Sequence, residues 1–407
     1  MNEPDLLLGL DVGTTKVAAV IGARGAEVRL LAAACVPCRG LRRGAVVDLE
    51  ETTRAITAAV AQARQAAGVE VDSAWVGITG QHLACLNARA DMPIPRHHRQ
   101  IGWAEVEKVM ASAVAAVSVP PDRQLLHAIS RGFWVDGEPR VRNPVGLSAT
   151  RLAVDTHVVT GSRAMIENVV TCVNGAGLSV AELVAEPLAA ADAVLTEEEE
   201  ELGVLLVDVG GGTMDVALFV EGSIAFTGAV PVAGNHVTHD VAVALGVTHP
   251  FAEQVKLAYG SALPRQVPEE DRVALDDRET TVSRRFLCQV IHARVDEMFR
   301  LVAEVMEGAH VRWPPPGGLV LTGGGSLLPG IAPVAGQVLG CRTRLGRPRV
   351  IAGPAEMLDS PALATGLGLV YYAHREAESR RSDTREAVRA LPILGRIVAW
   401  VRDLFSS

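Results

Sequence analysis

An aspartate followed closely by three glycines stands near the middle of the chain. The apolar run 204–207 leads into Asp208. Gly210, Gly211 and Gly212 come next. Because glycine has no Cβ, backbone N–H groups can approach an anion here, and the carboxylate can hold a magnesium ion through its waters. The pattern indicates a site for a phosphate–magnesium group, and the alternative is a tight hairpin turn without a ligand.

A second stretch of the same design lies near the N-terminus. The apolar run 6–10 ends in Asp11, and an apolar strand follows at 17–21. The turn between them contains Gly13, Thr14, Thr15 and Lys16, and its counterpart in the middle of the chain ends with Thr213. Two strand–aspartate–glycine–strand hairpins predict a duplicated domain, with both turns facing the same phosphates across a cleft.

A third glycine turn supports a nucleotide site. Gly323, Gly324, Gly325 and Ser326 follow an apolar strand at 319–321. We expect a helix at 327–339 directly after them, whose N-terminus would favour negative charge. The glycines would allow a flat approach to adenine and the α-phosphate. The GxGxxG fingerprint is absent, which argues against NAD.

The elements around these turns alternate between strands and helices. A strand at 30–37, a helix at 49–67 and a strand at 73–80 follow the first hairpin, which is an α/β pattern. Glu186 and Pro187 open a helix in front of the central hairpin, and proline suits a first helical position.

Three motifs carry a resemblance to a known superfamily. DVGTTK, DVGGGTMD and LTGGGSLLPG resemble the turns of the ATPase superfamily of actin, sugar kinases and heat-shock chaperones. Within it, the chain resembles the FtsA family of bacterial division proteins, which tie FtsZ to the membrane. Further matching stretches are RGLRRGAVVDLE, NPVGLSATRL and SPALATGLGLVYYA. The similarity runs from about Leu6 to the C-terminus.

The resemblance implies an α/β fold of the actin-like, ribonuclease-H-like duplicated type, with two lobes, an inserted small α+β domain and a C-terminal amphipathic helix. The inserted domain would make contacts between subunits, although a decorative surface domain is the alternative. The expected segments are 1–82, 162–201 and 360–374 for lobe 1; 83–161 for the inserted domain; 202–236 and 307–359 for lobe 2; 237–306 for a smaller subdomain; 375–390 for a flexible linker; and 391–407 for the terminal helix.

The resemblance also implies ATP and Mg²⁺ as ligands. Asp11 and Asp208 would hold the waters of the magnesium ion and take part in catalysis. Thr14, Thr15 and Lys16 would meet the phosphates. Hydrolysis would be slow at most, since ATP would act as an assembly switch.

Two further places have an implied role at the nucleotide. Glu186 would orient or deprotonate the attacking water, and the alternative is a charge that caps a helix start. Glu253 and Lys256 would face the ribose and adenine, and the alternative is an ordinary surface pair three residues apart.

A long helix predicted at 284–306 would carry the docking site for the acidic, apolar C-terminal peptide of FtsZ. Arg294 and Glu297 match family positions there, and Arg278 and Arg285 could add charge. The alternative is a helix that faces solvent.

The C-terminal segment has the pattern of a helix that binds a membrane surface. Its apolar residues recur at helical spacing, with arginines on the other face. Bound in the bilayer interface, it would attach the protein reversibly to anionic lipid. A helix packed back on the body or on a partner is the alternative. The membrane-facing residues would be Leu394, Ile397, Val398, Trp400, Val401, Leu404 and Phe405.

Composition narrows the remaining classes. The formal net charge of −9 makes nucleic acid an improbable main partner. The N-terminus lacks the pattern of a secretory signal, and no run of about 18 apolar residues predicts a membrane span. Neither the lone Cys35-Val-Pro-Cys38 pair nor His97-His98 has the further ligands that a zinc site needs.

The motifs together with the resemblance imply an ATP-binding protein that forms filaments on the cytoplasmic face of the cell membrane at the division site, binds FtsZ and recruits later division proteins. One alternative is a PilM-like adaptor of a pilus system, against which the terminal helix argues. Another is a small-molecule kinase, whose ATP consumption would rise with a hydroxylated substrate.

Overall fold

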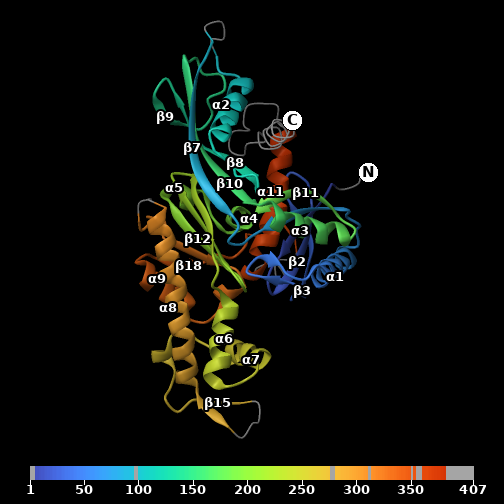
Figure 1. The fold of residues 1–407 in the computed structure, drawn as a ribbon, viewed down its shortest axis with the longest axis vertical. Helices are drawn as coiled ribbons and strands as arrows, with labels where there is room; N and C mark the ends of the chain where they lie inside the picture. The colour runs from blue at the N-terminus through green and yellow to red at the C-terminus, as the bar shows by residue number, and fades with distance from the viewer. Residues whose placement is uncertain are drawn as a thin grey trace.

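The computed structural model describes residues 5–95, 100–275, 280–309, 313–349, 352–353 and 360–381. The molecule is elongated: two sheet-based lobes lie side by side at its centre, the inserted domain lies at one end and a helical subdomain at the other (Figure 1). Among the described residues, no helix has the length and apolar character needed to cross a bilayer.

The two lobes contain sheets of the same topology. In each, three strands form an antiparallel meander, and the first of them also pairs in parallel with a fourth strand that pairs in parallel with a fifth. The predicted duplication of the fold is therefore confirmed. The sheet of lobe 1 contains β1 (Leu6–Val12), β2 (Lys16–Ala23), β3 (Arg29–Pro37), β6 (Ser73–Ile78) and β11 (Ser179–Ala185). The sheet of lobe 2 contains β12 (Val204–Val209), β13 (Met214–Val220), β14 (Ser223–Val230), β17 (Leu319–Thr322) and β18 (Thr343–Leu345).

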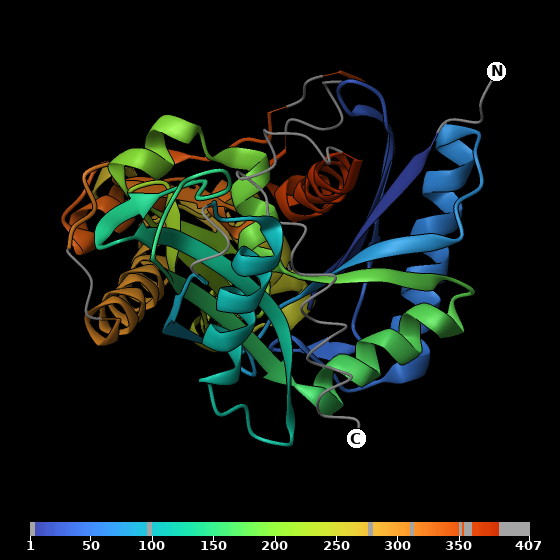
Figure 2. The same cartoon turned by 90° about the horizontal axis from the view of Figure 1, so that it is seen from above.

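Helices cover both faces of the lobe-1 sheet (Figure 2). On the outer face, α1 (Leu49–Ala67) packs on β2 and β3, and α3 (Arg163–Gly175) lies beside it. The predicted bounds of α1 are confirmed because the ends are capped: the Asp48 carboxylate accepts a hydrogen bond from the Glu51 N–H, and Gly68 takes the left-handed conformation.

Two helices fill the space between the lobes. One, α11 (Ala364–Arg381), packs on β1, β2 and β6, and the other, α4 (Glu186–Val194), packs on β12 and β13. They cross closely, since a Cβ on Gly368 would lie only 1.7 Å from the Ala189 carbonyl oxygen. Apolar side chains of both sheets and both helices form one core cluster, so the lobes are joined by a packed core.

The inserted domain is a four-stranded sheet with one helix on it. The strand order is β7-β10-β8-β9, and α2 packs on β7 and β10 around a core that includes Ile101, Met110 and Phe133. Its last strand, β9, was not predicted. The elements are β7 (Ala84–Pro93), α2 (Trp103–Ala115), β8 (Arg123–Val135), β9 (Glu138–Val141) and β10 (Arg151–Ser162).

The smaller subdomain extends from lobe 2 on three helices. The longest, α8, keeps one apolar side buried along its whole length. The elements are α6 (Gly234–Leu245), α7 (His249–Tyr259), β15 (Arg272–Ala274), β16 (Thr281–Ser283) and α8 (Arg284–Gly308). The remaining described elements outside it are β4 (Leu41–Arg42), β5 (Ala45–Val46), α5 (Glu197–Leu202), α9 (Ile331–Leu339) and four-residue or shorter 3₁₀ turns.

Two predictions about helix ends are wrong. The segment 375–381, predicted as part of a flexible linker, continues α11. Its charges are held by the body: Arg375 forms an ion pair with Asp192, and Glu376 is buried. The helix predicted to start at residue 327 begins instead at Ile331, after a 3₁₀ turn at Gly324–Leu327. The predicted terminal helix, 391–407, lies outside the described residues.

Candidate functional site

The two acidic turns face one another where the lobes meet. Each is closed by the same backbone hydrogen bond, from Gly13 N–H to the Lys16 oxygen (2.9 Å) and from Gly210 N–H to the Thr213 oxygen (3.0 Å). A Cβ on Gly211 would lie 2.3 Å from the Thr15 methyl carbon, and one on Gly212 would lie 2.6 Å from the Thr14 hydroxyl oxygen. The structure thus brings the predicted phosphate-binding turns together, and glycine is needed because the turns touch.

Lys16 reaches from its turn toward other parts of the site. Its ammonium lies 3.8 Å from the Asp11 carboxylate and donates a hydrogen bond to the Ala362 carbonyl oxygen at the start of α11. The side chain is 26% exposed. A partly exposed ammonium beside a buried acid can move toward an added anion.

Asp11 and Asp208, each one residue before the end of its strand, are both buried. Burial raises the pKa of Asp11, and the Lys16 ammonium opposes this rise. Burial also raises the pKa of Asp208 to about 6, against the hydrogen bond that Thr365 donates to its carboxylate (2.7 Å). A cation bound beside these carboxylates would lower both pKa values and favour the ionised forms.

Glu186, the first residue of α4, lies in the same buried cluster. Its Oε1 has no hydrogen-bond partner in the part of the chain that the structure describes. Its side chain packs on Gly77, where an added Cβ would lie 2.9 Å from Oε1. Burial and the negative charges of Asp11 and Asp215 raise the pKa of Glu186 well above its usual value.

Asp215 belongs to the cluster although the sequence reasoning missed it. It stands opposite Asp208 in the β12–β13 pair, and Thr79 of lobe 1 donates a hydrogen bond to it at 2.6 Å. Burial raises its pKa to about 8. The signal was present: in a hairpin, residues equally distant from the turn share a face, and Asp208 and Asp215 flank the turn symmetrically.

The predicted pair Glu253 and Lys256 lies on α7, next to the start of α6. The Lys256 ammonium contacts the Glu253 carboxylate at 2.7 Å and the Thr238 hydroxyl at 2.9 Å. The start of α6 is in turn bonded to the second turn, since Gly234 N–H donates to the Gly210 oxygen at 3.1 Å. The pair is therefore linked to the second turn by a continuous set of contacts.

The third glycine turn packs against the end of β12. A Cβ on Gly323 would lie 2.0 Å from the Asp208 carboxylate, and one on Gly325 would lie 2.5 Å from Val209. Gly324 is less crowded, and Ser326 is buried with its hydroxyl bonded to the Gly323 oxygen (2.7 Å). Two of these glycines are thus required by contacts within the protein.

A cavity of about 1070 Å³ lies away from this cluster. It is bounded by the inserted domain, α4, α11 and the β13–β14 turn, with Arg131, Asp192 and Tyr371 among its lining residues. None of the residues predicted at the nucleotide lines it. This cavity therefore does not coincide with the predicted nucleotide site.

Comparison with known proteins identifies the family. The model for the cell division protein FtsA matches residues 205–368, and the model for the SHS2 domain inserted in FtsA matches residues 80–160. The cell division protein FtsA of Pseudomonas aeruginosa is 36% identical over 98% of this chain and 98% of its own length. The chain belongs to the FtsA family. The FtsA proteins of Escherichia coli K12 and Bacillus subtilis are 32% and 30% identical, over 99% and 93% of this chain and 99% and 85% of their own lengths.

Solved structures agree on the fold. A chain of the PilM-PilN type IV pilus biogenesis complex superposes with a TM-score of 0.66 at 19% identity, covering 90% of this chain and 98% of that chain. MreB5 of Spiroplasma citri bound to ADP gives 0.54 at 14% identity, covering 93% and 99%. These likenesses show the actin-like fold. The protein is an actin-like cell division protein.

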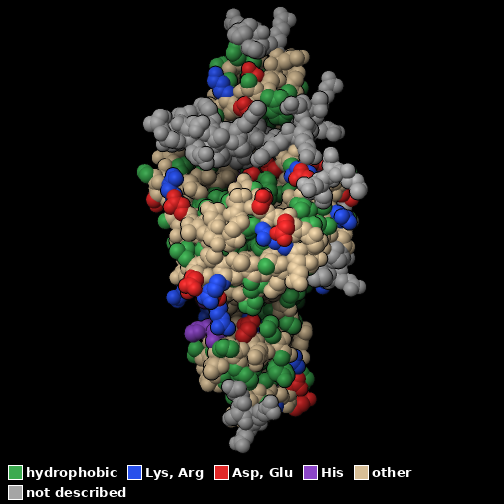
Figure 3. Space-filling model, turned by 90° about the vertical axis from the view of Figure 1, so that its right-hand side faces the viewer, with side chains coloured by type: hydrophobic (Ala, Val, Ile, Leu, Met, Phe, Trp, Pro, Cys, Tyr) green, Lys and Arg blue, Asp and Glu red, His purple; other side chains and the backbone are tan. Residues whose placement is uncertain are grey.

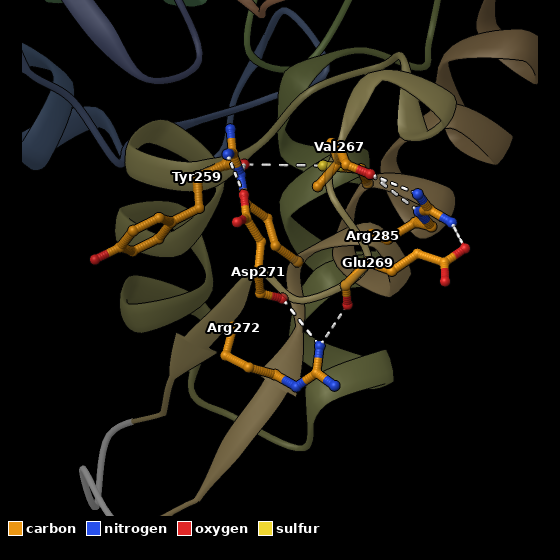
Figure 4. A network of polar contacts seen from close by, with 8 residues as sticks. Tyr259, Val267, Glu269, Asp271, Arg272 and Arg285 are labelled. Atoms are coloured by element: carbon orange, nitrogen blue, oxygen red, sulfur yellow. Dashed lines mark hydrogen bonds and ion pairs between the residues drawn. The ribbon is translucent and has the colours of Figure 1, made fainter.

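The FtsA resemblance placed a partner site on α8, and the described arginines there are engaged within the protein. Arg285 donates to the Val267 carbonyl oxygen (2.8 Å) and pairs with Glu269 (Figure 4). Arg294 bonds to Asp240 at 2.9 Å and to Glu297 at 2.5 Å. An acidic peptide of an FtsA partner would have to compete with these carboxylates.

Other residues predicted from the FtsA resemblance lie outside the described residues. They are Arg278 and the membrane-facing set Leu394, Ile397, Val398, Trp400, Val401, Leu404 and Phe405.

On the face drawn in Figure 3, the described positive and negative side chains are interspersed. The field over that face is thus of mixed sign.

Proposed function

We propose that this FtsA-family protein binds ATP with Mg²⁺ between its lobes and, in that state, assembles into filaments on the cytoplasmic face of the membrane at the division site. There it would bind the C-terminal peptide of FtsZ and recruit later division proteins. The observation that carries the nucleotide part is the pair of acidic turns that meet across a duplicated fold.

The phosphates would lie along the two turns. Lys16 would exchange its contact with Ala362 for a phosphate oxygen, and backbone N–H groups of the turns would donate to others. Thr14, Thr15 and Thr213 would add hydroxyl groups. The third turn, at Gly323–Ser326, would lie toward adenine, with Glu253 and Lys256 toward the ribose.

The buried carboxylates fit a magnesium ion held through water. Among the described residues, no group of three or more histidine, cysteine or acidic side chains is arranged to hold a metal alone. Mg²⁺ commonly keeps several waters and binds one or two carboxylates plus phosphates, which Asp11 and Asp208 could supply. The ion would neutralise charge on the phosphates and on these carboxylates, whose pKa values are raised by burial.

Glu186 would face the attacking water. Its Oε1 is buried and has no hydrogen-bond partner among the described residues, which suits an oxygen that accepts a hydrogen bond from a bound water. Burial and the neighbouring acids raise its pKa, so its carboxylate binds a proton more tightly, as a general base must. Turnover would be slow, so that the bound nucleotide acts as a switch.

The remaining segments would divide the other tasks. The inserted domain at 83–161 would contact the next subunit, and the subdomain at 237–306 would bind FtsZ through Arg285, Arg294, Glu297 and Arg278. The segment 391–407 would hold the protein on anionic lipid. Neither the pilus adaptor nor the small-molecule kinase is favoured by an observation on the described residues.

The deciding experiment uses purified protein, Mg²⁺-ATP and vesicles that contain anionic lipid. The full chain should sediment with the vesicles and form filaments on them in electron micrographs, and a chain without residues 391–407 should do neither. Val401→Glu, on the apolar face, should abolish sedimentation, and Ser406→Glu is the matched control that adds the same charge beyond that face. Undiminished sedimentation of the truncated chain would refute the membrane assignment.

A further inference from the structure

The last strand before Glu186 lies at an edge of the lobe-1 sheet. It is β11, and it pairs on one side only, with β6, through Ala185 opposite Ile78. Backbone N–H groups on the other side of an edge strand have no strand partner. If such a group is buried without a hydrogen bond, it destabilises the fold.

The inserted domain supplies the missing partner at Ala185. The Ala185 N–H donates a hydrogen bond of 2.9 Å to Nε2 of His127, on strand β8. Both residues have no exposed surface. A side chain from a separate domain thus satisfies the backbone of the residue directly before Glu186.

The chemistry of His127 keeps this bond in one form. Because Nε2 accepts, the ring proton is on Nδ1, which lies 3.5 Å from the Tyr372 hydroxyl oxygen on α11. Burial, with the positive charge of Arg375 in addition, lowers the pKa of His127 to about 4. The imidazole therefore stays neutral near pH 7 and remains an acceptor.

The start of α4 is buried, and Ala185 leads directly into it. Ala185 is its N-cap and has no side-chain hydrogen bond to offer, and Glu186 is its first residue. Among the described residues, one carboxyl oxygen of Glu186 has no hydrogen-bond partner. The carboxyl is held at the cleft by the backbone of Ala185, by packing on Gly77 and by a hydrogen bond with the Asp215 side chain.

We propose that His127 is a positioning residue through which the inserted domain holds the Glu186 carboxyl in place at the nucleotide cleft. The proposal rests on the function proposed above, because it assumes that the cleft turns over ATP. It gives the inserted domain a role in turnover as well as in subunit contacts.

The same face of the β8–β10 pair is also tied to lobe 2. His157 Nε2 lies 3.0 Å from the Thr227 hydroxyl on β14, and Asn87 donates to the Ala225 carbonyl oxygen at 3.0 Å. The domain is thus bonded to both lobes through separate histidines. A displacement of the domain by a neighbouring subunit would reach Glu186 through His127.

The test compares three variants of the full chain. His127→Leu removes the acceptor and should lower kcat for ATP about tenfold, while the dissociation constant for ATP changes less than about twofold. His127→Gln, whose amide oxygen can accept from Ala185, should recover most of the rate. His157→Leu is the matched control, since it removes an equally buried imidazole without touching Ala185, and its kcat should stay within about twofold of the wild type.

Amide hydrogen exchange gives a second readout that needs no nucleotide. A peptide covering residues 179–188 should exchange faster in His127→Leu than in His127→Gln, because the Ala185 N–H has lost its acceptor. Should His127→Leu fail to fold, His127→Asn, whose shorter amide does not reach, makes the same comparison. Equal exchange and equal kcat in a folded variant overturn the proposal. A wild-type protein without ATP turnover overturns the proposed function instead, and the exchange result then decides the link alone.

Discussion

In lobe 1, Asp11 lies one residue before the end of β1 and the turn that follows contains Lys16, whereas in lobe 2 Asp208 lies one residue before the end of β12 and the turn is made almost wholly of glycine. The turns share one backbone hydrogen bond, and the strands share one register. Their side chains differ, since Asp11 stands opposite Ala18 and Asp208 stands opposite Asp215.

Because of this difference, the two hairpins bring different charges to the cleft. The β1–β2 hairpin of lobe 1 combines Asp11 with Lys16, whereas the β12–β13 hairpin of lobe 2 combines Asp208 with Asp215 and has no lysine or arginine. The duplicated fold has kept the hydrogen-bonded frame, which positions the turns, and has changed the residues that carry charge. Burial raises the pKa of all three aspartates, and only in the lobe-1 hairpin does an ammonium of the same hairpin oppose this rise.

The largest effect is expected when Glu186, which lies in neither glycine turn, is replaced. In Glu186→Ala, ATP hydrolysis should fall about 100-fold or more, as for loss of a base, with unchanged ATP affinity. Gly77→Ala should act similarly, because its Cβ would displace the retained carboxyl. Turnover is measured by phosphate release, with the α3 variant Glu167→Ala as control. Unchanged turnover in Glu186→Ala would remove the role assigned to this residue.

The next test asks whether the lobes share the metal equally. Asp11→Asn and Asp208→Asn keep the side-chain size and remove one charge each. If both aspartates hold waters of the ion, each substitution should raise the Mg²⁺ concentration needed for ATP binding roughly 10–100-fold. ATP affinity is titrated at several Mg²⁺ concentrations, with the exposed Asp122→Asn as control. No change in either variant contradicts the assignment, and a change in one alone gives the metal to that lobe.

A third test concerns Asp215, whose counterpart in the β1–β2 hairpin is Ala18. Burial raises the pKa of Asp215 to about 8 from 3.8. Between these pH values the folded protein keeps a proton that the unfolded chain has lost, so the free energy of unfolding falls as the pH rises, by up to about 1.4 kcal/mol per pH unit from this group. Asp215→Asn should flatten that slope in urea unfolding between about pH 5 and pH 8. A slope equal to that of the wild type and of Asp122→Asn would show that Asp215 ionises normally.

Elements with local signals could be predicted from the sequence. The ends of α1 are set by Asp48 and Gly68, which act on their own helix. The two hairpins could be predicted because aspartate, glycine and apolar alternation lie within a few residues of each other. The missed strand β9 also has a local signal, since Asp136-Gly137 is a favoured hairpin turn.

Features that depend on distant residues could not be predicted. The helix α11 continues through a charged segment because Arg375 pairs with Asp192, which lies 183 residues away. The 3₁₀ turn at Gly324–Leu327 replaces the predicted helix start where the glycines pack against the end of β12. Nothing local marks His127, whose partner Ala185 lies in another domain. Tertiary context decided each case.

The smallest expected effect concerns how each aspartate is held. Asp208 accepts a hydrogen bond from Thr365 at 2.7 Å, whereas Asp11 lies 3.8 Å from the Lys16 ammonium. Thr365→Val should lower the free energy of unfolding by about 1 to 2 kcal/mol, as for loss of a bond to a charged group. Because that bond favours the ionised carboxylate, the variant should also raise the pKa of Asp208 further above its usual value.

The pH dependence of this loss separates a charge effect from simple packing. Burial raises the pKa of Asp208 to about 6, so the difference between wild type and Thr365→Val should be larger at pH 7.5 than at pH 5. Urea unfolding at both pH values measures it. Thr171→Val, which loses an exposed bond to its own helix, should change stability by less than about 0.5 kcal/mol. If Thr365→Val lowers the free energy of unfolding equally at both pH values, Thr365 acts through the packing of α11. The hydrogen bond to Asp208 would then not distinguish it from Asp11.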